Sequence, residues 1–327
     1  MNEWRVIALG QAGVDFVGRE LDTSLKDMRT FEKAGGGTPA NTAVGLAKLG
    51  IPVMFIGKVG DDSFGHFLAY SLKSNGVDVS EFQFDKTAKT TIGFESTLDE
   101  PELLIYGDPG PHILLRKNEI NQSCFQQKSP LFLFGSMTLT HNPGREATLF
   151  AADLAIKNNI PISFDPNLRL SIWPSTKEAQ KTVKKALQKA NIVKLSFEEF
   201  KFLSGYNETE KINDFRQAYS IDLIFVTVKN GCYYCNRSRQ GFVKGVEIDA
   251  IDTTGAGDGF CAGFLYKILK LKVTGSRSLR DLSDEQLVEI GRFANAAGAL
   301  TTMKRGVIPA LPTFDEINSF LKEHQRE

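Results

Sequence analysis

The chain has 327 residues, and its 39 lysines and arginines balance its 39 aspartates and glutamates, so its formal net charge at pH 7 is zero. This length allows one large domain with an extra lobe or two ordinary domains, and the neutral charge argues against nucleic acid, which binds best to a basic surplus. The sequence has neither a run of about 18 apolar residues nor the basic-then-apolar order of a signal peptide. We therefore expect a cytoplasmic protein that binds no membrane.

Short apolar runs alternate with helical stretches along the chain. Strands are predicted at residues 5–9, 53–59, 131–134, 160–164, 192–195 and 223–228, and helices at 41–49, 63–74, 145–157, 177–190, 257–269, 284–303 and from residue 314 onward. Capping-box patterns precede three of these helices, at Ser175-x-x-Glu178, Ser283-x-x-Gln286 and Thr313-x-x-Glu316. The alternation predicts βαβ units, and therefore a mostly parallel sheet covered by helices on both faces.

Two segments interrupt this alternation, residues 14–33 and residues 87–116. The second contains two strand-like runs, 90–96 and 103–106. We interpret the two segments as a small β-lobe added to the main domain. The main domain would then comprise residues 1–13, 34–86 and 117–327.

The first of two glycine clusters is Gly35-Gly36-Gly37, which leads through Asn41 into a helix of small residues. Glycines let a ligand approach the backbone, and a helix N-terminus offers unpaired N–H donors, so the segment suits a polar small molecule such as a sugar. The spacing also fits a loose dinucleotide-binding pattern. However, the residues before it, 30–34, make a poor buried strand, and no acidic residue ends a strand about 20 residues later, which disfavours a dinucleotide oxidoreductase.

The second glycine cluster is Asp252-Thr253-Thr254-Gly255-Ala256-Gly257-Asp258-Gly259-Phe260. The N–H groups of residues 255–257 at the start of a helix form an anion-binding nest. Asp258 places a carboxylate beside the nest, which suits phosphoryl transfer: the nest holds the migrating group while the carboxylate takes a proton from the attacking hydroxyl. A plain glycine turn with an acidic residue favouring the helix dipole is the alternative, and these residues alone leave both open.

Cys232 and Cys235 form a C-x-x-C pattern inside a strand-like run. Residues i and i+3 of a strand point to opposite faces, so we expect the two thiols to diverge. No second cysteine pair and no clustered histidines follow at metal-binding spacing. We therefore expect structural cysteines and no transition-metal site.

The run 252–260 resembles the C-terminal signature of the ribokinase-like (PfkB) carbohydrate kinases, and 35–50 resembles their N-terminal signature. Residues 165–174 and 306–312 resemble the fructokinase branch. The resemblance extends over essentially the whole chain. It implies a three-layer α/β/α fold with a small β-sheet lid, and an ATP-dependent fructokinase that phosphorylates the 6-hydroxyl of fructose. 2-Keto-3-deoxygluconate kinase, another ketose kinase, and a non-catalytic sugar or nucleotide sensor on the same fold remain as alternatives.

The resemblance also implies roles for individual residues. Asp258 would be the general base, with Gly255, Ala256 and Gly257 as the anion hole. The sugar would be held by Asp15, Gly36, Gly37, Asn41, Tyr106 and Arg169, and the nucleotide by Lys194, Ser196, Thr227, Gly231, Gly257 and Asn295. Glu199 would support Mg²⁺ indirectly, and Asp252 and Thr254 would hold a monovalent cation such as K⁺.

Several of these residues also have ordinary structural interpretations. Asp15 could be a loop acid, Asn295 a polar residue of a packed helix, and Ser196-x-x-Glu199 is a good capping box in its own right. The nucleotide loop, residues 227–231, is shorter than the family pattern and lacks its first glycine. Gly107 stands in the lid where the fructokinases commonly have an arginine.

The predicted lid also carries apolar residues at alternating positions, namely Ile92, Phe94, Leu104 and Tyr106. An exposed β-lobe needs its open apolar face covered. We therefore expect a homodimer that forms through the lid.

Overall fold

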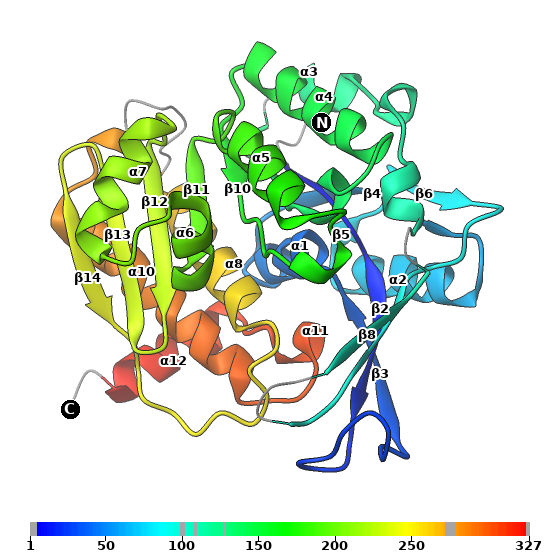
Figure 1. The fold of residues 1–327 in the computed structure, drawn as a ribbon. Coiled ribbons are helices and arrows are strands. Elements are labelled where there is room, and N and C mark those ends of the chain that lie inside the picture. Colours follow the sequence, from blue (N-terminus) through cyan, green and yellow to red (C-terminus); the bar gives the residue numbers. More distant parts are fainter. Residues whose placement is uncertain (1–4, 99–101, 108–109, 127–128, 272–278, 325–327) are drawn as a thin grey trace.

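The structure is a computed structural model that describes residues 5–98, 102–107, 110–126, 129–271 and 279–324. Within these residues a large sheet crosses the molecule, and a smaller sheet stands beside it at the lower right (Figure 1). The large sheet runs in the order β14-β13-β12-β11-β10-β9-β1-β4-β5, and β6 also pairs with β4. Pairing is parallel from β5 to β12, and β13 and β14 join antiparallel at one edge.

The strands of the large sheet are short and mostly buried. Their bounds are β1 Val6–Leu9, β4 Val53–Gly60, β5 Val77–Asp78, β6 Phe82–Asp85, β9 Phe132–Phe134, β10 Ile162–Phe164, β11 Ile192–Ser196, β12 Leu223–Val228, β13 Gly231–Asn236 and β14 Gln240–Lys244. Successive side chains alternate between two hydrophobic clusters: Val6 and Ala8 belong to one, Ile7 and Leu9 to the other. Both faces of the sheet are therefore covered by helices, as the run of apolar residues in each strand predicts.

Helices form a layer on each face. One cluster includes residues of α1 Thr38–Lys48, α2 Ser63–Ser74, α8 Ala256–Lys270, α10 Asp284–Thr302, α11 Val307–Ala310 and α12 Phe314–His324, and the other includes residues of α3 Ser123–Gln126, α4 Gly144–Lys157, α5 Thr176–Leu187, α6 Phe197–Ser204 and α7 Ile212–Ala218. Short 3₁₀ helices occupy Pro111–Leu114, Lys117–Glu119, Met137–Leu139, Leu170–Ile172 and Thr209–Lys211. The fold is thus a three-layer α/β/α domain, as expected.

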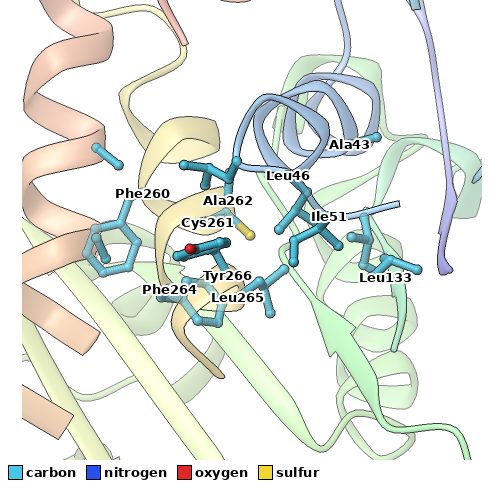
Figure 2. Close-up of a cluster of buried hydrophobic side chains, with 14 of the residues drawn as sticks. Ala43, Leu46, Ile51, Leu133, Phe260, Cys261, Ala262, Phe264, Leu265 and Tyr266 are labelled. Atoms are coloured by element: carbon cyan, nitrogen blue, oxygen red, sulfur yellow. The ribbon is translucent and has the colours of Figure 1, made fainter. Parts of the chain in front are cut away.

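Helix α8 packs closely between α1 and α10. In Figure 2, Cys261 lies on the side of α8 that faces Leu46 of α1, and Phe260 lies on the opposite side. Glycines make this close packing possible: a Cβ added to Gly45 would come within 2.5 Å of Ala262, and one added to Gly263 within 2.9 Å of Ala297. The packing fixes the N-terminus of α8, which carries the second glycine cluster.

The smaller sheet has the strand order β3-β2-β7-β8. Its strands are β2 Gly13–Gly18, β3 Phe31–Gly36, β7 Ile92–Glu95 and β8 Leu103–Tyr106. Phe16 and Phe94 stack with ring centroids 5.2 Å apart, and Phe16 also meets Phe64 of α2 edge-on. Since β2 follows closely on β1 and β3 leads directly into α1, this sheet is joined to the main one at the first glycine cluster.

Long periodic segments were predicted well. Helix α2 and strand β12 have the expected bounds, whereas α1 begins at Thr38, three residues before the predicted start. Pro39 accounts for this difference, because proline fits the first turn of a helix, where no backbone donor is needed. The prediction missed the short elements β5, β6, α6, α7 and β14, whose length gives little periodicity.

Two of the three predicted capping boxes are complete. Gln286 and Glu316 return a side-chain oxygen to the backbone N–H of their cap residues. Before α5, the Ser175 hydroxyl accepts from the N–H of Glu178, but the Glu178 carboxylate accepts from Arg145 at 2.6 Å instead of closing the box. The reciprocal half of that prediction was wrong, because a guanidinium competes for the carboxylate.

The prediction that the two thiols of the C-x-x-C pattern diverge is confirmed. Cys232 and Cys235 of β13 belong to different hydrophobic clusters, on opposite faces of the sheet. All four cysteines of the chain are free and buried. In the described part of the chain, no helix combines the length and the apolar composition that crossing a membrane requires.

Candidate active site

Two helix N-termini meet at a buried carboxylate. Gly255, in the left-handed conformation with φ 80°, caps α8, and Asp258 lies in the first turn. Its carboxylate is only 6% exposed, and Oδ2 accepts a hydrogen bond from Nδ2 of Asn41, in the first turn of α1, at 2.7 Å. The two glycine clusters, more than 200 residues apart in the sequence, therefore form one site through a direct side-chain contact.

Burial raises the pKa of Asp258, while the Asn41 hydrogen bond and the nearby ammonium of Lys194 oppose the rise. A carboxylate with a raised pKa is a stronger base when it is ionised. Asn41 and Lys194 keep the ionised form accessible. The environment therefore suits a proton acceptor.

Lys194 is a buried cation directly behind the nest. It is the middle residue of β11, is 6% exposed, and pairs with Asp165 at 3.3 Å. Burial disfavours its charge, but the carboxylates of Asp165 and Glu199 outweigh burial and raise its pKa. Its Nζ lies 2.9 Å from the point that a Cβ on Gly257 would occupy. The ammonium therefore adds positive charge next to the N–H groups of the nest.

A first cavity of about 350 Å³ opens in front of Asp258, and its wall includes residues of the smaller sheet and of the main domain. Of the predicted sugar-binding residues, Asp15, Gly37, Asn41 and Arg169 line it. Its other walls come from Gln11, Gly13, Thr38, Thr91, Gly93, Glu95, Leu103, Ile105, Met137, Asn167, Lys194, Thr253, Thr254, Gly255, Gly257, Asp258 and Val307. The mixture of amides, carboxylates and short apolar side chains suits a small hydroxylated ligand.

Two predicted sugar-binding residues do not line this cavity. Gly36 lies directly beside Asp15, and a Cβ there would meet Asp15 Oδ2 at 1.8 Å. Tyr106 is 56% exposed and lies on the face of β8 opposite to Ile105, which does line the cavity. The structure therefore gives Gly36 an indirect place in the site and places Tyr106 outside it.

A second, larger cavity of about 820 Å³ lies on the other side of the nest. Thr227, Gly231 and Asn295 line it, together with residues 228–230, 244–248, 250, 256, 260, 298, 299 and 302. Asn295 Nδ2 donates to the carbonyl of Val243 at 3.1 Å. Most residues that line this cavity are small or apolar, and Lys229, Lys244 and Glu247 are its charged members.

The two cavities share wall residues. Thr253 and Gly257 line both, so the nest at the start of α8 lies where the cavities meet. Asp258 opens only to the first cavity and Asn295 only to the second. The start of α8, where the sequence predicts an anion-binding nest, therefore lies between two compartments.

The remaining predicted nucleotide and magnesium residues support the loops around the site. Glu199 Oε2 accepts from the N–H of Ser196 at 2.7 Å, which closes a full capping box on α6. Its Oε1 accepts from the N–H of Leu168 at 2.8 Å. Ser196 and Glu199 line neither cavity, and Lys194 lines the first cavity and not the second. The structural interpretation of the Ser196–Glu199 pair is therefore satisfied.

Asp252 and Thr254 hold the nest loop in place. Asp252 Oδ1 accepts from the N–H of Thr254 at 2.9 Å, and its Oδ2 accepts from the N–H of Gly306 at 3.2 Å. Within the described residues, no three acidic, histidine or cysteine side chains gather at one point as ligands for a metal. A divalent cation at this site would therefore need ligands from a bound phosphate.

The sequence analysis missed Glu95, Gln11 and Asn167 as cavity residues. Asn167 carries a positive φ of 39° and donates to the Thr38 hydroxyl, which ties the loop after β10 to the start of α1. Asn167 could have been predicted from its neighbour Arg169, a predicted sugar-binding residue, because both belong to the same polar run after β10. Glu95 gave none, because an acid in a lid strand is usually solvated.

Asp15 is half-buried on β2 and has an unusual acidity. Burial, with added repulsion from Glu95 and Asp258, raises its pKa to about 7, and Arg169 opposes the rise. A carboxylate that is kept partly desolvated is suited to accept hydrogen bonds from ligand hydroxyls.

Comparison with known proteins identifies a family across nearly the whole chain. Residues 4–314 match the pfkB family carbohydrate kinase. A probable fructokinase-4 of Arabidopsis thaliana is 40% identical over 322 residues, which cover 97% of this chain and 96% of that protein.

Solved structures give the same result. The fructokinase with bound ATP from Xylella fastidiosa superposes with a TM-score of 0.88 at 29% identity, covering 98% of this chain and 99% of its own. The fructokinase from Vibrio cholerae O395 in its form with bound fructose, ADP and calcium gives a TM-score of 0.86 at 30% identity, covering 98% of this chain and 100% of its own.

Proposed function

The chain belongs to the pfkB family of carbohydrate kinases, and we propose that it is an ATP-dependent fructokinase that transfers the γ-phosphoryl group to the 6-hydroxyl of D-fructose. One observation carries the proposal: two cavities of different chemistry meet at the Gly255–Gly257 nest, and the buried Asp258 carboxylate faces only the smaller one. Fructokinases of known structure bind fructose with ADP, or ATP, on the same fold, which supports the assignment.

Asp258 is the general base of this proposal. With fructose in the first cavity, its carboxylate accepts the proton of the attacking hydroxyl as the bond from that oxygen to phosphorus forms. Its raised pKa makes it a stronger base than an exposed aspartate, and Asn41 fixes its orientation through the 2.7 Å hydrogen bond. General-base groups of this kind contribute about 10²–10⁴-fold to the rate.

The nest and Lys194 stabilise the transferred group. Negative charge spreads over the three outer oxygens of the phosphoryl group during transfer. Gly257 lines both cavities and Gly255 lines the first, so their N–H groups would stabilise that charge, whereas the N–H of Ala256 donates to the carbonyl of Thr253 at 3.3 Å. The Lys194 ammonium lies directly behind Gly257 and is kept protonated by its carboxylate neighbours. ADP then leaves from the second cavity, which Thr227, Gly231 and Asn295 line.

Magnesium enters this reaction as part of the substrate MgATP, where it neutralises phosphate charge. The described residues offer no group of three acidic, histidine or cysteine side chains that could hold a metal ion, which fits a magnesium ion that is bound mainly by the phosphates of ATP. For a monovalent cation such as K⁺, Asp252 and Thr254 lie at the nest loop with carboxylate and hydroxyl oxygens. A double-mutant fructokinase from Vibrio cholerae O395 has been solved in a form with bound fructose, ADP and potassium, which supports a role for a monovalent cation in such a kinase.

The smaller sheet acts as a lid in this proposal. Its strands lie within residues 13–36 and 92–106, which extend beyond the predicted segment 14–33 and fall inside the predicted segment 87–116. Gly93, Leu103 and Ile105 already form part of the first cavity's wall, so closure there would exclude the water that competes with fructose. The outer face of β8 is open to solvent, with Leu104 47% exposed. We infer that this face pairs with a second lid in a homodimer, and a monomeric mass in solution at micromolar protein would contradict the pairing.

We also place the protein in the cytoplasm. Four buried free cysteines suit a reducing compartment, and ATP is supplied there. Cell fractionation with an antibody against the chain tests the location, and recovery from an oxidising compartment would contradict it.

Asp258→Asn is the test of the proposed function. ADP release is measured for the wild type and the variant over fructose, 2-keto-3-deoxygluconate, ribose, glucose and adenosine. We expect fructose to be the best substrate and the variant to lose about 10²–10⁴-fold in kcat. Equal rates in the two proteins would refute the base. If no sugar stimulates ADP release, the non-catalytic sensor becomes the better explanation.

A further inference from the structure

Glu95 is an acidic side chain inside the sugar-side cavity to which the proposed reaction gives no role. It ends strand β7 and lines the cavity together with Gly93, two residues earlier, because alternate residues of a strand share a face. Its Oε1 accepts a hydrogen bond from Oγ1 of Thr254 at 3.4 Å. A lid residue therefore reaches across the cavity as far as the nest loop.

The charges of the cavity wall are unequal. Asp15, Glu95 and Asp258 supply three carboxylates, and Arg169 and Lys194 supply two cations. Lys194 is already paired with Asp165, which lies behind the cavity and not in its wall. Arg169 is thus the cation left to balance the acids at the lid side of the cavity.

Arg169 is also partly engaged, since its Nη1 donates to Asn167 Oδ1 at 3.1 Å. Burial raises the pKa of Glu95, and repulsion from Asp252 adds to the rise, while Arg169 and the Thr254 hydroxyl oppose it. Glu95 in turn helps to raise the pKa of Asp15. The acids of this cavity therefore already repel one another before any ligand enters.

Building on the proposed function, we propose that Glu95 determines specificity: it accepts hydrogen bonds from the hydroxyl groups of a neutral sugar and excludes sugar acids. A neutral sugar brings hydroxyl donors, which both Glu95 and Asp15 can accept. A sugar acid brings a further negative charge into a partly desolvated cavity where carboxylates outnumber free cations, and repulsion of this kind discriminates as strongly as attraction. Glu95 would thus separate fructose from 2-keto-3-deoxygluconate.

The variant Glu95→Gln isolates the charge. Glutamine has nearly the same size, and its Oε1 can still accept from Thr254, so the local shape is kept. Glu102→Gln is the matched control, because Glu102 is an exposed acid immediately before β8 that lies outside the cavity, and its Oε2 accepts a hydrogen bond from the N–H of Leu25 at 2.7 Å. Glu95→Asp keeps the charge and should keep the exclusion.

The readouts are kcat/KM for fructose and the dissociation constants of 2-keto-3-deoxygluconate and gluconate, from competitive inhibition and from calorimetry. We expect Glu95→Gln to bind both sugar acids about tenfold more tightly than the wild type, as removal of one charge at a cavity wall implies. Its kcat/KM for fructose should fall, while Glu102→Gln and Glu95→Asp should retain the wild-type preference.

Sugar-acid affinities in Glu95→Gln within twofold of the wild type would overturn the proposal. An equal gain in sugar-acid affinity in Glu102→Gln would also overturn the proposal, because the gain would then come from the total charge of the lid and not from Glu95. If fructose stimulates no ADP release in the wild type, the proposed function fails, yet the calorimetric comparison of sugar acids still tests Glu95. Matching thermal midpoints in the wild type and Glu95→Gln would exclude a purely structural effect.

Discussion

The two compartments on either side of the nest are built differently. The first is lined by charged and amide side chains such as Asp15, Glu95, Asn41 and Arg169, which come from the smaller sheet, from α1 and from the loop after β10. The second is lined mostly by small or apolar residues of β12, α8, α10 and the segment 245–250, and its charged members are Lys229, Lys244 and Glu247. We infer that the sugar is selected by side chains and the nucleotide by shape and backbone, which is why substitutions should affect the two substrates unequally.

The largest effect should come from the point that both compartments share. In Gly257→Val the added side chain would meet Lys194 Nζ and fill the nest. We expect kcat to fall about 10²–10³-fold, the loss typical of removing oxyanion-hole donors, while fructose and ATP still bind. Single-turnover kinetics and equilibrium dialysis measure the two quantities. A variant that binds both substrates and turns over normally would contradict a nest that holds the phosphoryl group.

The next effect concerns the cation behind the nest. Lys194→Met should lower kcat by about 10²-fold and also destabilise the fold, because Asp165 would lose its buried partner. The double variant Lys194→Met, Asp165→Asn should recover the thermal midpoint but not kcat. Recovery of both would mean that Lys194 acts only through folding.

A matched pair of asparagines separates the two compartments. Asn41→Ala should raise KM for fructose about tenfold and leave KM for ATP unchanged. Asn295→Ala should raise KM for ATP by a smaller factor and leave KM for fructose unchanged. Loss of the Asn41 hydrogen bond also raises the pKa of Asp258 further, so the acid limb of the kcat profile should move to higher pH. If each variant changed both KM values equally, the division into compartments would be wrong.

The smallest effect is on stability. In the folded chain the pKa of Asp15 is raised from 3.8 to about 7, so the folded state holds this proton more tightly than the unfolded chain does. The stability it contributes is therefore present at low pH and lost as pH rises through about 7. Between about pH 5.5 and about pH 8, the thermal midpoint of Asp15→Asn should fall by a few degrees less than that of the wild type. The exposed acid Asp27, changed to Asn, is the control and should behave like the wild type.

The same contrast explains what the sequence could predict. Helices with long apolar periodicity, such as α2, and the two glycine clusters were identifiable because each signal is local in the chain. The contact between Asn41 and Asp258, and the pairing of Lys194 with Asp165, depend on how α1, α8 and the central strands pack together. Glu95 was missed because only the position of β7 against the nest turns an ordinary lid acid into a cavity residue.

The central claim is that the hydroxyl to be phosphorylated meets Asp258 where the two compartments join. A crystal structure with fructose and a non-hydrolysable ATP analogue measures this directly, as the distance from the fructose 6-hydroxyl oxygen to the Asp258 carboxylate. We predict a hydrogen-bond distance of about 2.6–3.2 Å, with the terminal phosphate at the N–H groups of residues 255–257. A sugar hydroxyl held elsewhere, or a nucleotide whose phosphates lie away from the nest, would contradict the claim.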